Sequence, residues 1–227
     1  MEIILAKTAG FCFGVNRAVN IAQKTAEECS GCVTFGQIIH NNEVVKKLEE
    51  MGVYVVNTTD EVRPENTVII RSHGVRPEII EEIEKKGARV IDATCPDVSK
   101  IHKIVKSESE KGRRIVIVGE KHHPEVDAIS GWCKHYDIIE NKEDAEKWVL
   151  ENEHQPDMPV SVVSQTTMNG ENFETCINII KKLCTNLEIF DTICRTTSNR
   201  QKEADELSRK CDGMIVIGGK HSANSNR

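Results

Sequence analysis

The chain has 227 residues, of which 38% are hydrophobic and 29% charged, and its net charge is −6 at pH 7. This length allows one large domain or two to three small α/β lobes. Scattered basic residues in an acidic chain argue against nucleic-acid binding by this portion, and no apolar run is long enough to cross a bilayer. We therefore expect a cytoplasmic protein with neither a membrane nor a nucleic-acid partner.

The first predicted element is a buried strand at residues 3–6. Beyond it, short apolar runs alternate with helical patterns. Strands are expected at residues 33–39, 67–72, 113–119, 159–164 and 213–218, and helices at 43–52, 76–87 and 98–112. The three helical runs end on Gly52, Gly87 and Gly112, as expected where a left-handed residue stops a helix. This alternation predicts an α/β fold with parallel sheets.

The first residues lack the basic leader and the long apolar core of a signal peptide, so we expect the nine cysteines of this chain to lie in reducing cytosol. Reducing cytosol keeps thiols free, so metal ligation or catalysis is expected before disulfides. Cys29 and Cys32 form a CSGC motif, which could be a redox or zinc half-site but is read more simply as a helix-to-strand turn, since no second pair follows at similar spacing. Four other cysteines in or beside helical patterns are expected to pack in the core: Cys133, Cys176, Cys184 and Cys211.

The remaining cysteines mark a threefold internal repeat. Cys12, Cys95 and Cys194 recur at intervals of 83 and 99 residues, each after an apolar strand and before a helix. After each of these helices a strand ends in glycine, and four residues past that glycine stands a polar side chain: His40, His123 or Ser222. The third unit stops 33 residues after its cysteine. The repeat therefore predicts that this sequence lacks the end of a third lobe.

A second strand in each of the first two units also ends in hydrogen-bonding residues. These are Ser72 and His73 in the first unit, and Ser164, Gln165, Thr166 and Thr167 in the second. Ligands of parallel α/β sheets bind beyond the carboxyl ends of the strands. We therefore expect these side chains to surround the three thiols.

Three equivalent cysteines without a fourth suit a cubane iron–sulfur cluster with one iron left open for substrate. Gly10 and Gly14 would permit close backbone approach, and Phe11 and Phe13 would exclude solvent. Pro96 is expected to open the helix after the second cysteine. The alternative is that each cysteine is a small buried hydrophobic residue. The matched positions in three units favour ligation.

Three histidines at strand ends, His40, His73 and His123, are candidates for an anion cradle, especially for a diphosphate, together with Ser222 and Asn224. A single histidine in such a place is often satisfied by the backbone alone. The repeat favours these three over histidines that lack such a context: His102, His135 and His154.

Glu125, in the sequence HPE, would lie beside this cradle. Near anions its affinity for protons should rise, which suits a general acid. The alternative is a solvated glutamate in the first turn of a helix.

The ordered motifs GFCFGV, RSHG, DATCP, HPE, SQTT, TTSNR and SANSNR resemble those of the 4-hydroxy-3-methylbut-2-enyl diphosphate reductase family over the whole chain. The resemblance implies three pseudo-threefold-related α/β lobes with small, mainly parallel sheets around a central metal cluster, a trefoil. The lobes would comprise residues 13–95, residues 96–193, and residues 1–12 with 194–227. Cys12, Cys95 and Cys194 would hold a four-iron four-sulfur cluster.

The resemblance also implies the reaction. The family reduces (E)-4-hydroxy-3-methylbut-2-enyl diphosphate to isopentenyl and dimethylallyl diphosphate, the last step of the methylerythritol phosphate (non-mevalonate) isoprenoid pathway. Glu125 would be the proton source and Thr166 its relay. Substrate contacts would come from His40, His73, His123, Thr166, Thr167, Ser222, Ala223 and Asn224, with Gln165 adjacent. Ala223 stands where the family usually has serine, which weakens one phosphate contact.

Reduced ferredoxin or flavodoxin is the expected electron donor, because no nucleotide-binding fingerprint such as GxGxxG is present. Two other classes of protein stay open at this point. One is a non-redox diphosphate sensor that keeps the cluster only as a structural element. The other is a thiol–disulfide protein built on CSGC.

Overall fold

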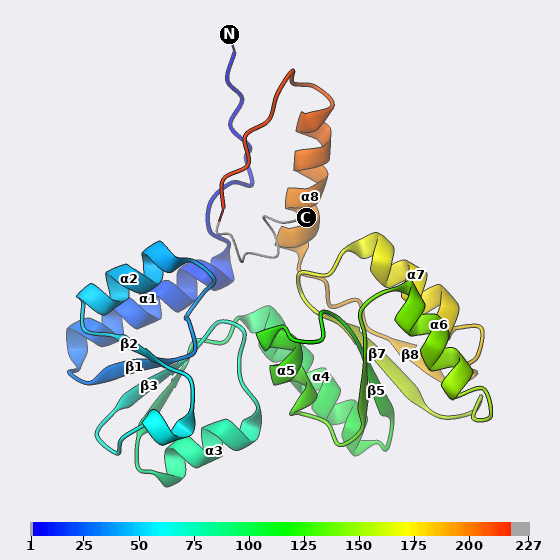
Figure 1. Cartoon of the computed structure of the whole chain (residues 1–227), viewed down its shortest axis with the longest axis horizontal. Coiled ribbons are helices and arrows are strands. Elements are labelled where there is room, and N and C mark those ends of the chain that lie inside the picture. The colour runs from blue at the N-terminus through cyan, green and yellow to red at the C-terminus, as the bar shows by residue number, and fades with distance from the viewer. Residues whose placement is uncertain (1, 219–227) are drawn as a thin grey trace.

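The computed structural model describes residues 2–218 of the chain (Figure 1). The helices in this part are α1 (Phe13–Glu28), α2 (Asn42–Glu50), α3 (Pro77–Lys85), α4 (Pro96–Glu110), α5 (Pro124–Ser130), α6 (Lys142–Glu151), α7 (Gly170–Ile180), α8 (Arg195–Ser208) and the 3-10 helix η1 (Thr59–Glu61). The strands are β1 (Cys32–Phe35), β2 (Tyr54–Val56), β3 (Thr67–Ile70), β4 (Arg89–Asp92), β5 (Arg114–Val118), β6 (Tyr136–Ile139), β7 (Val160–Ser164) and β8 (Leu187–Ile189).

The strands form two separate four-stranded sheets that lie side by side in Figure 1. Their orders are β2-β1-β3-β4 and β6-β5-β7-β8, and all neighbouring strands are parallel. We call β1–β4 with α1–α3 the first unit, and β5–β8 with α4–α7 the second unit. The predicted α/β class with parallel sheets is confirmed, and both sheets follow one strand order.

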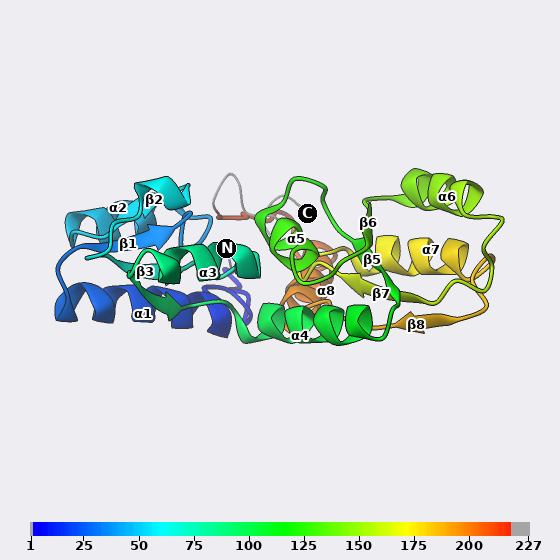
Figure 2. The same cartoon turned by 90° about the horizontal axis from the view of Figure 1, so that it is seen from below.

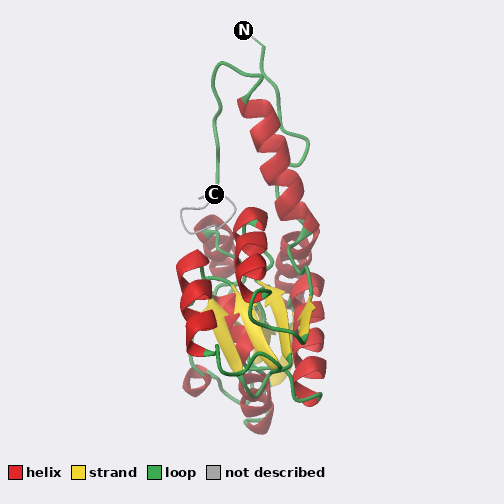
Figure 3. Ribbon diagram, turned by 90° about the vertical axis from the view of Figure 1, so that its right-hand side faces the viewer, coloured by secondary structure: helices red, strands yellow, loops and turns green. Residues whose placement is uncertain are grey.

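Helices cover both faces of each sheet, as Figures 2 and 3 show. In the first unit, α1 and α2 share one apolar cluster with the sheet, and α3 shares another on the opposite face. In the second unit, α6 and α7 cover one face and α4 and α5 the other. Central strands such as β3 and β5 are therefore buried on both faces and read as unbroken apolar runs. The ends of the strands are left for a functional site.

The predicted starts and stops of the helices agree with the structure. Gly52, Gly87 and Gly112 have φ values of +86°, +86° and +79°, and each follows the C-cap residue of α2, α3 or α4. Only glycine adopts this left-handed conformation without a steric penalty, so the three residues end their helices. Pro96 is the first residue of α4, with Cys95 as its N-cap, as predicted.

Two predicted strands are wrong in the described part of the chain. Residues 3–6 and 213–218 form no strand, and their apolar side chains are largely exposed, with Leu5 and Ile217 at 83% and 92%. A strand needs a neighbour for its backbone hydrogen bonds, and no described segment pairs with either run. The apolar pattern alone was not sufficient evidence for burial.

The amino-terminal segment is tied to α8 instead, and the two rise together above both units in Figure 1. Glu203 of α8 accepts hydrogen bonds from the backbone amides of Lys7 and Thr8 at 2.7 and 2.8 Å. Arg200 donates to the carbonyl oxygen of Thr8 at 3.0 Å and also to that of Gly10.

No helix between residues 2 and 218 is long and apolar enough to span a membrane.

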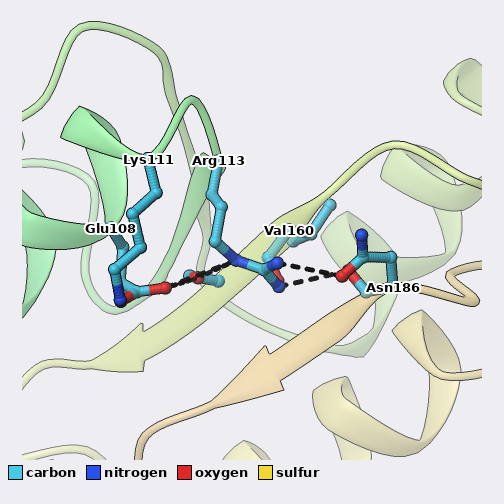
Figure 4. A network of polar contacts seen from close by, with 6 residues as sticks. Glu108, Lys111, Arg113, Val160 and Asn186 are labelled. Atoms are coloured by element: carbon cyan, nitrogen blue, oxygen red, sulfur yellow. Dashed lines mark hydrogen bonds and ion pairs between the residues drawn. The ribbon is translucent and has the colours of Figure 1, made fainter.

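A polar network closes the amino-terminal edge of the second sheet (Figure 4). Glu108, at the end of α4, is 4% exposed and accepts hydrogen bonds from Lys111 at 2.5 Å and Ser161 at 2.9 Å. Arg113 donates to Ser161 at 2.7 Å and to Asn186 at 2.9 Å. Burial alone raises the pKa of Glu108, but the hydrogen bonds from Lys111 and Ser161 bring it below its ordinary value. The network therefore holds an ionised carboxylate.

Replacing Glu108 by alanine should lower the free energy of unfolding by about 2–4 kcal/mol, because Arg113 and Ser161 lose their carboxylate. The matched control is Glu110→Ala in the same helix. Glu110 is exposed, so its loss should change the free energy of unfolding by less than about 0.5 kcal/mol. Urea unfolding at pH 7 measures both. Since the folded-state pKa of Glu108 is lowered, the difference from wild type should disappear as the pH falls through that pKa. Equal stability of the two variants would contradict the prediction.

Candidate functional site

The three repeated cysteines occupy equivalent places at the starts of helices. Cys12, Cys95 and Cys194 are the N-cap residues of α1, α4 and α8, and each has non-helical backbone torsion angles. The carbonyl oxygen of each accepts the first hydrogen bond of its helix, at 2.9, 2.9 and 3.2 Å. All three thiols are free and half-buried. Amide groups at a helix start favour negative charge, so they would help to stabilise thiolates once a metal is bound.

A glycine brings the first two of these helices together. A Cβ atom on Gly14 would lie 2.5 Å from the Sγ atom of Cys95, so only glycine fits there. The predicted close approach is therefore confirmed at Gly14 but is wrong at Gly10, where a Cβ atom would meet nothing within 4 Å in the described part of the chain. The predicted shielding by Phe11 and Phe13 is not confirmed, because these rings are 47% and 74% exposed. No described segment covers the side on which they stand.

The cysteines are also joined to the ends of the strands by their backbone amides. The amide of Cys95 donates to the carbonyl of Ser72 at 2.9 Å, and that of Cys194 donates to the carbonyl of Thr166 at 2.9 Å. Ser72 and Thr166 each lie just beyond the third strand of their unit, β3 and β7. Two of the three cysteines therefore adjoin the polar strand ends that the repeat singled out.

The thiols of Cys95 and Cys194 favour the protonated form. The pKa of Cys95 is raised to about 11, mainly by burial, with smaller contributions from the charges of Asp97 and Cys12. Burial also raises the pKa of Cys194, as does its hydrogen bond to Asp97 at 3.2 Å. A metal would have to supply the charge that stabilises the thiolates.

The histidine cluster comprises His40 after β1, His73 after β3 and His123 at the N-cap of α5. Ring centroids are 4.4 Å apart for His40 and His73, 5.7 Å for His40 and His123, and 5.5 Å for His73 and His123. One nitrogen from each ring lies within 4.8 Å of the others, and all three residues are half-buried. The cluster joins the first unit to the second.

Electrostatics keep at least one of these rings neutral. Burial lowers the pKa of His73 well below its ordinary value, and the charges of His40, His123 and Arg71 lower it further. The Nδ1 atom of His73 is buried and has no hydrogen-bond partner among the described residues. A buried polar atom without a partner marks a place where a ligand atom would be stabilising.

The tautomer of His123 decides between a metal and an anion as this ligand. Its Nδ1 atom accepts a hydrogen bond from the amide of Glu125 at 3.1 Å. The neutral ring therefore carries its proton on Nε2, which becomes a hydrogen-bond donor. A donor at Nε2 suits phosphate oxygens, whereas a metal would need that nitrogen unprotonated. The cluster is therefore better suited to an anion.

Glu125 is the buried carboxyl group of the site. It is 2% exposed, so the alternative of a solvated first-turn glutamate is wrong. Its two oxygens accept hydrogen bonds from the amide of Thr166 at 2.6 Å and from the Thr166 hydroxyl at 2.8 Å. Burial raises the pKa of Glu125 to about 7, and the charges of Asp97 and Glu120 contribute to the rise. A carboxyl group with this pKa can hold and release a proton near neutral pH.

Gln165 and Thr167 continue this strand end. Gln165 is fully buried, and its side chain accepts from the amide of Glu120 at 3.0 Å and donates to the Thr167 hydroxyl at 2.8 Å. The structure thus holds Thr167 beside the loop that leads to His123. Ser222, Ala223 and Asn224 lie outside the described residues.

Most of the residues that were assigned structural roles keep them, but the predicted core position of Cys211 is wrong, because this half-buried residue belongs to no apolar cluster of the described residues. α1 ends at Glu28 and β1 begins at Cys32, so CSGC is a helix-to-strand turn. The Cys32 thiol donates to the carbonyl of Cys29 at 3.2 Å, and burial raises its pKa to about 11. Cys176 and Cys184 are buried in the core of the second unit. The three histidines that were expected to lie outside the cluster do so: His102 is buried in α4, and His135 and His154 are exposed.

Sequence reasoning missed Asp97 and Arg71. Asp97 accepts from the Cys194 thiol and raises the pKa of Glu125, so it lies between a cysteine and the carboxyl group. Arg71 is half-buried and adds positive charge beside His73. The only signal in the sequence was adjacency to Cys95 and to His73, which does not indicate where a side chain points.

Comparison with known proteins identifies relatives along the whole chain. Residues 3–227 match the model of the family described as LytB protein. The chain is 43% identical over 232 residues to the 4-hydroxy-3-methylbut-2-enyl diphosphate reductase of Caldanaerobacter subterraneus subsp. tengcongensis, covering 100% of this chain and 78% of that protein.

Two solved structures share the fold. One is an (E)-4-hydroxy-3-methyl-but-2-enyl diphosphate reductase, described as the terminal enzyme of the non-mevalonate pathway, with a TM-score of 0.79, 40% identity, and coverage of 99% of this chain and 79% of that one. The other is an E-1-hydroxy-2-methyl-but-2-enyl-4-diphosphate reductase from Plasmodium falciparum, with a TM-score of 0.89, 30% identity, and coverage of 96% and 68%.

Proposed function

The chain belongs to the LytB protein family of 4-hydroxy-3-methylbut-2-enyl diphosphate reductases, and on this premise we propose how its residues carry out the reaction. The reaction removes the 4-hydroxyl group of the allylic diphosphate as water, consuming two electrons and two protons, and yields isopentenyl and dimethylallyl diphosphate. It is the terminal step of the non-mevalonate pathway. The protein must therefore hold a diphosphate, deliver protons and accept electrons.

The observation that carries the proposal is a continuous chain of hydrogen bonds through the site. The amide of Cys194 donates to the carbonyl of Thr166, whose hydroxyl donates to Glu125. The amide of Glu125 donates to His123. A thiol, a protonatable carboxyl group and an anion-binding histidine are thus fixed relative to one another.

Cys12, Cys95 and Cys194 would hold a four-iron four-sulfur cluster. The support is their equivalent placement at three helix starts and the contact of Gly14 with Cys95. When bound, such a cluster supplies single electrons and one iron without a protein thiolate, which can take the substrate hydroxyl group. Ferredoxin or flavodoxin in the reduced state is the proposed donor.

The histidine cluster would bind the diphosphate, together with Thr167 and with Ser222, Ala223 and Asn224. The orphan Nδ1 atom of His73 and the Nε2 donor of His123 both favour phosphate oxygens. The negative charge of such a ligand would also raise the pKa of His73 from the low value that burial gives it. The bound anion would therefore be held by two units at once.

Glu125 would be the proton source, with Thr166 passing protons toward the leaving oxygen. Its pKa of about 7 leaves a large share of the carboxyl groups protonated at neutral pH. Water has little access, because Glu125 and Thr166 are 2% and 7% exposed. The proton is then delivered inside the site instead of being lost to solvent.

The same proposal extends to the organisation of the chain. Lobes at residues 13–95, at 96–193, and at 1–12 with 194–227 would meet at the cluster as a trefoil. The common strand order of the two described sheets supports a repeated unit. The hydrogen bonds of Glu203 and Arg200 to residues 7–10 support joining the first segment to α8.

Anaerobic purification followed by iron and sulfide analysis and a turnover assay tests this function. We expect about four irons per chain, electron paramagnetic resonance of a reduced cluster, and conversion of the allylic diphosphate with dithionite as the reductant. Reduced ferredoxin and flavodoxin are then compared as donors. Binding of the diphosphate without conversion would favour the sensor alternative, and an iron-free, active thiol oxidoreductase would favour the CSGC alternative.

A further inference from the structure

The loop that carries His73 lies at the junction of the two units. It runs from Arg71 to Arg76, between β3 and α3 of the first unit. On its far side stands α5 of the second unit, with His123 as N-cap and Glu125 in the first turn. The relative position of His73 and α5 therefore sets the shape of the site.

Packing presses this loop against the second unit. Gly74 has φ +72°, and a Cβ atom on it would lie 2.6 Å from the Cε1 atom of His102 in α4. The buried His102 ring stacks on Trp132, with centroids 5.1 Å apart and planes at 18°. The Trp132 indole donates to the carbonyl of Val75 at 3.3 Å. The loop is therefore fixed on its inner side by contact with two rings.

Arg76 makes the polar contact at the end of the loop. Its Nε and Nη2 atoms donate to one carboxylate oxygen of Asp127 at 3.0 and 2.8 Å, and Nη2 also donates to the Ser130 hydroxyl at 3.0 Å. A Cβ atom on Gly131 would lie 2.4 Å from the Cγ atom of Arg76, so the aliphatic part of the arginine rests directly on this glycine. The acceptors and the glycine span the second half of α5 and its C-cap.

We propose that Arg76 is a positioning residue: by holding Asp127 and Ser130 it fixes α5 against the loop of His73. Arg76 stands three positions after His73 in the chain, and Asp127 stands two positions after Glu125. The contact therefore lies close to the site in both units without belonging to it. The inference rests on the proposed roles of His73 and of His123 in binding the diphosphate.

Arginine suits this task better than other residues. Its planar guanidinium group donates in fixed directions, whereas lysine has a single flexible ammonium group. The side chains of Arg76 and Asp127 are 36% and 51% exposed, so solvent screens the ion pair and its effect on overall stability is small. Loss of the ion pair should instead change the position of His123 relative to His73, because the diphosphate must be held by histidines from two units at once.

Arg76→Met, which retains the packing on Gly131, and Asp127→Asn test the proposal in the iron-loaded enzyme. For each, we expect KM for the allylic diphosphate to rise about tenfold while kcat stays within about twofold, since Glu125 and Thr166 both belong to the second unit. Arg76→Lys should give an intermediate KM. The double variant should be no worse than the poorer single variant, because both changes remove one interaction.

Arg114→Met is the matched control. Arg114 pairs with Asp137 inside the second unit, with distances of 2.5 and 2.7 Å, at the opposite end of the strands. The Arg114→Met substitution should lower the melting temperature and leave KM for the allylic diphosphate unchanged. An unchanged KM in Arg76→Met, or a loss of melting temperature and kcat alone, overturns the proposal, because a merely structural contact gives that result.

Calorimetric binding of inorganic diphosphate separates this inference from the proposed function. It requires no turnover, so it reports the shape of the cradle even if the wild-type enzyme does not reduce the allylic diphosphate. A roughly tenfold weaker binding by Arg76→Met than by Arg114→Met supports the positioning role. Equal binding by the two variants overturns it.

Discussion

The Glu125→Gln variant should lose about 10²- to 10⁴-fold in kcat while it keeps its iron and its affinity for diphosphate. Glutamine retains the shape of the side chain and an oxygen that accepts from Thr166, whose amide and hydroxyl groups now donate to Glu125. It has no acidic proton to give. Steady-state kinetics with dithionite measure the loss, and near-normal rates would remove Glu125 from the role.

The pH dependence of the rate and of the stability gives a second test of the role of Glu125. Burial raises the pKa of Glu125 to about 7 from an ordinary value near 4.5. The wild-type rate should therefore fall as the pH rises through about 7, and the residual rate of Glu125→Gln should lack this limb. The stability linked to the protonated carboxyl group is complete below the unfolded-state pKa and is lost as the pH rises through 7. Above pH 7 the free energy of unfolding of Glu125→Gln should therefore rise relative to that of wild type.

Glu171→Gln is the matched control for both measurements. Glu171 is the second residue of α7, as Glu125 is of α5, but it is exposed. Its replacement should change neither kcat nor the pH profile. A comparable loss in this control would show that the assay responds to helix charge and not to the buried acid.

Replacing Cys12, Cys95 or Cys194 by serine should abolish reductase activity and empty or disrupt the cluster in each case. A hydroxyl group ionises far less readily than a thiol and is a poorer ligand for iron in a cluster. Iron and sulfide analysis of the three variants, with electron paramagnetic resonance after reduction, measures the loss. A variant that kept four irons and turned over would exclude that cysteine as a ligand.

Cys29→Ser and Cys32→Ser provide the comparison within the same chain. The Cys32 thiol donates to the carbonyls of Cys29 and Thr25, and a serine hydroxyl can do the same. Iron content and activity should therefore match wild type. Loss of iron in either variant would reopen a ligand role for CSGC.

Local patterns were sufficient for much of the fold. Gly52, Gly87 and Gly112 ended their helices as predicted because left-handed geometry depends on the residue itself. The segments at residues 3–6 and 213–218 carried the same apolar pattern as the buried strands, yet none of the residues described pairs with them. A strand depends on its neighbour, which the sequence of the strand does not contain.

The site was predictable where it follows the repeat, and not elsewhere. His40 and His123 share a position after a glycine, and the structure brings both beside His73. The contact of Arg76 with Asp127 joins residues 51 positions apart and has no counterpart in any motif. The burial of Glu125 also depends on packing between α5 and β7, which the HPE sequence does not reveal.

The attachment of the amino-terminal segment to α8 has a mechanical consequence. Glu203 and Arg200 of α8 form hydrogen bonds with the backbone of Lys7, Thr8 and Gly10. Cys12 is two positions further along the chain. α8 itself starts at Cys194. If α8 moved, these hydrogen bonds would carry residues 7–10 with it. Cys12 and Cys194 would then shift together as one rigid part, although most of the sequence separates them.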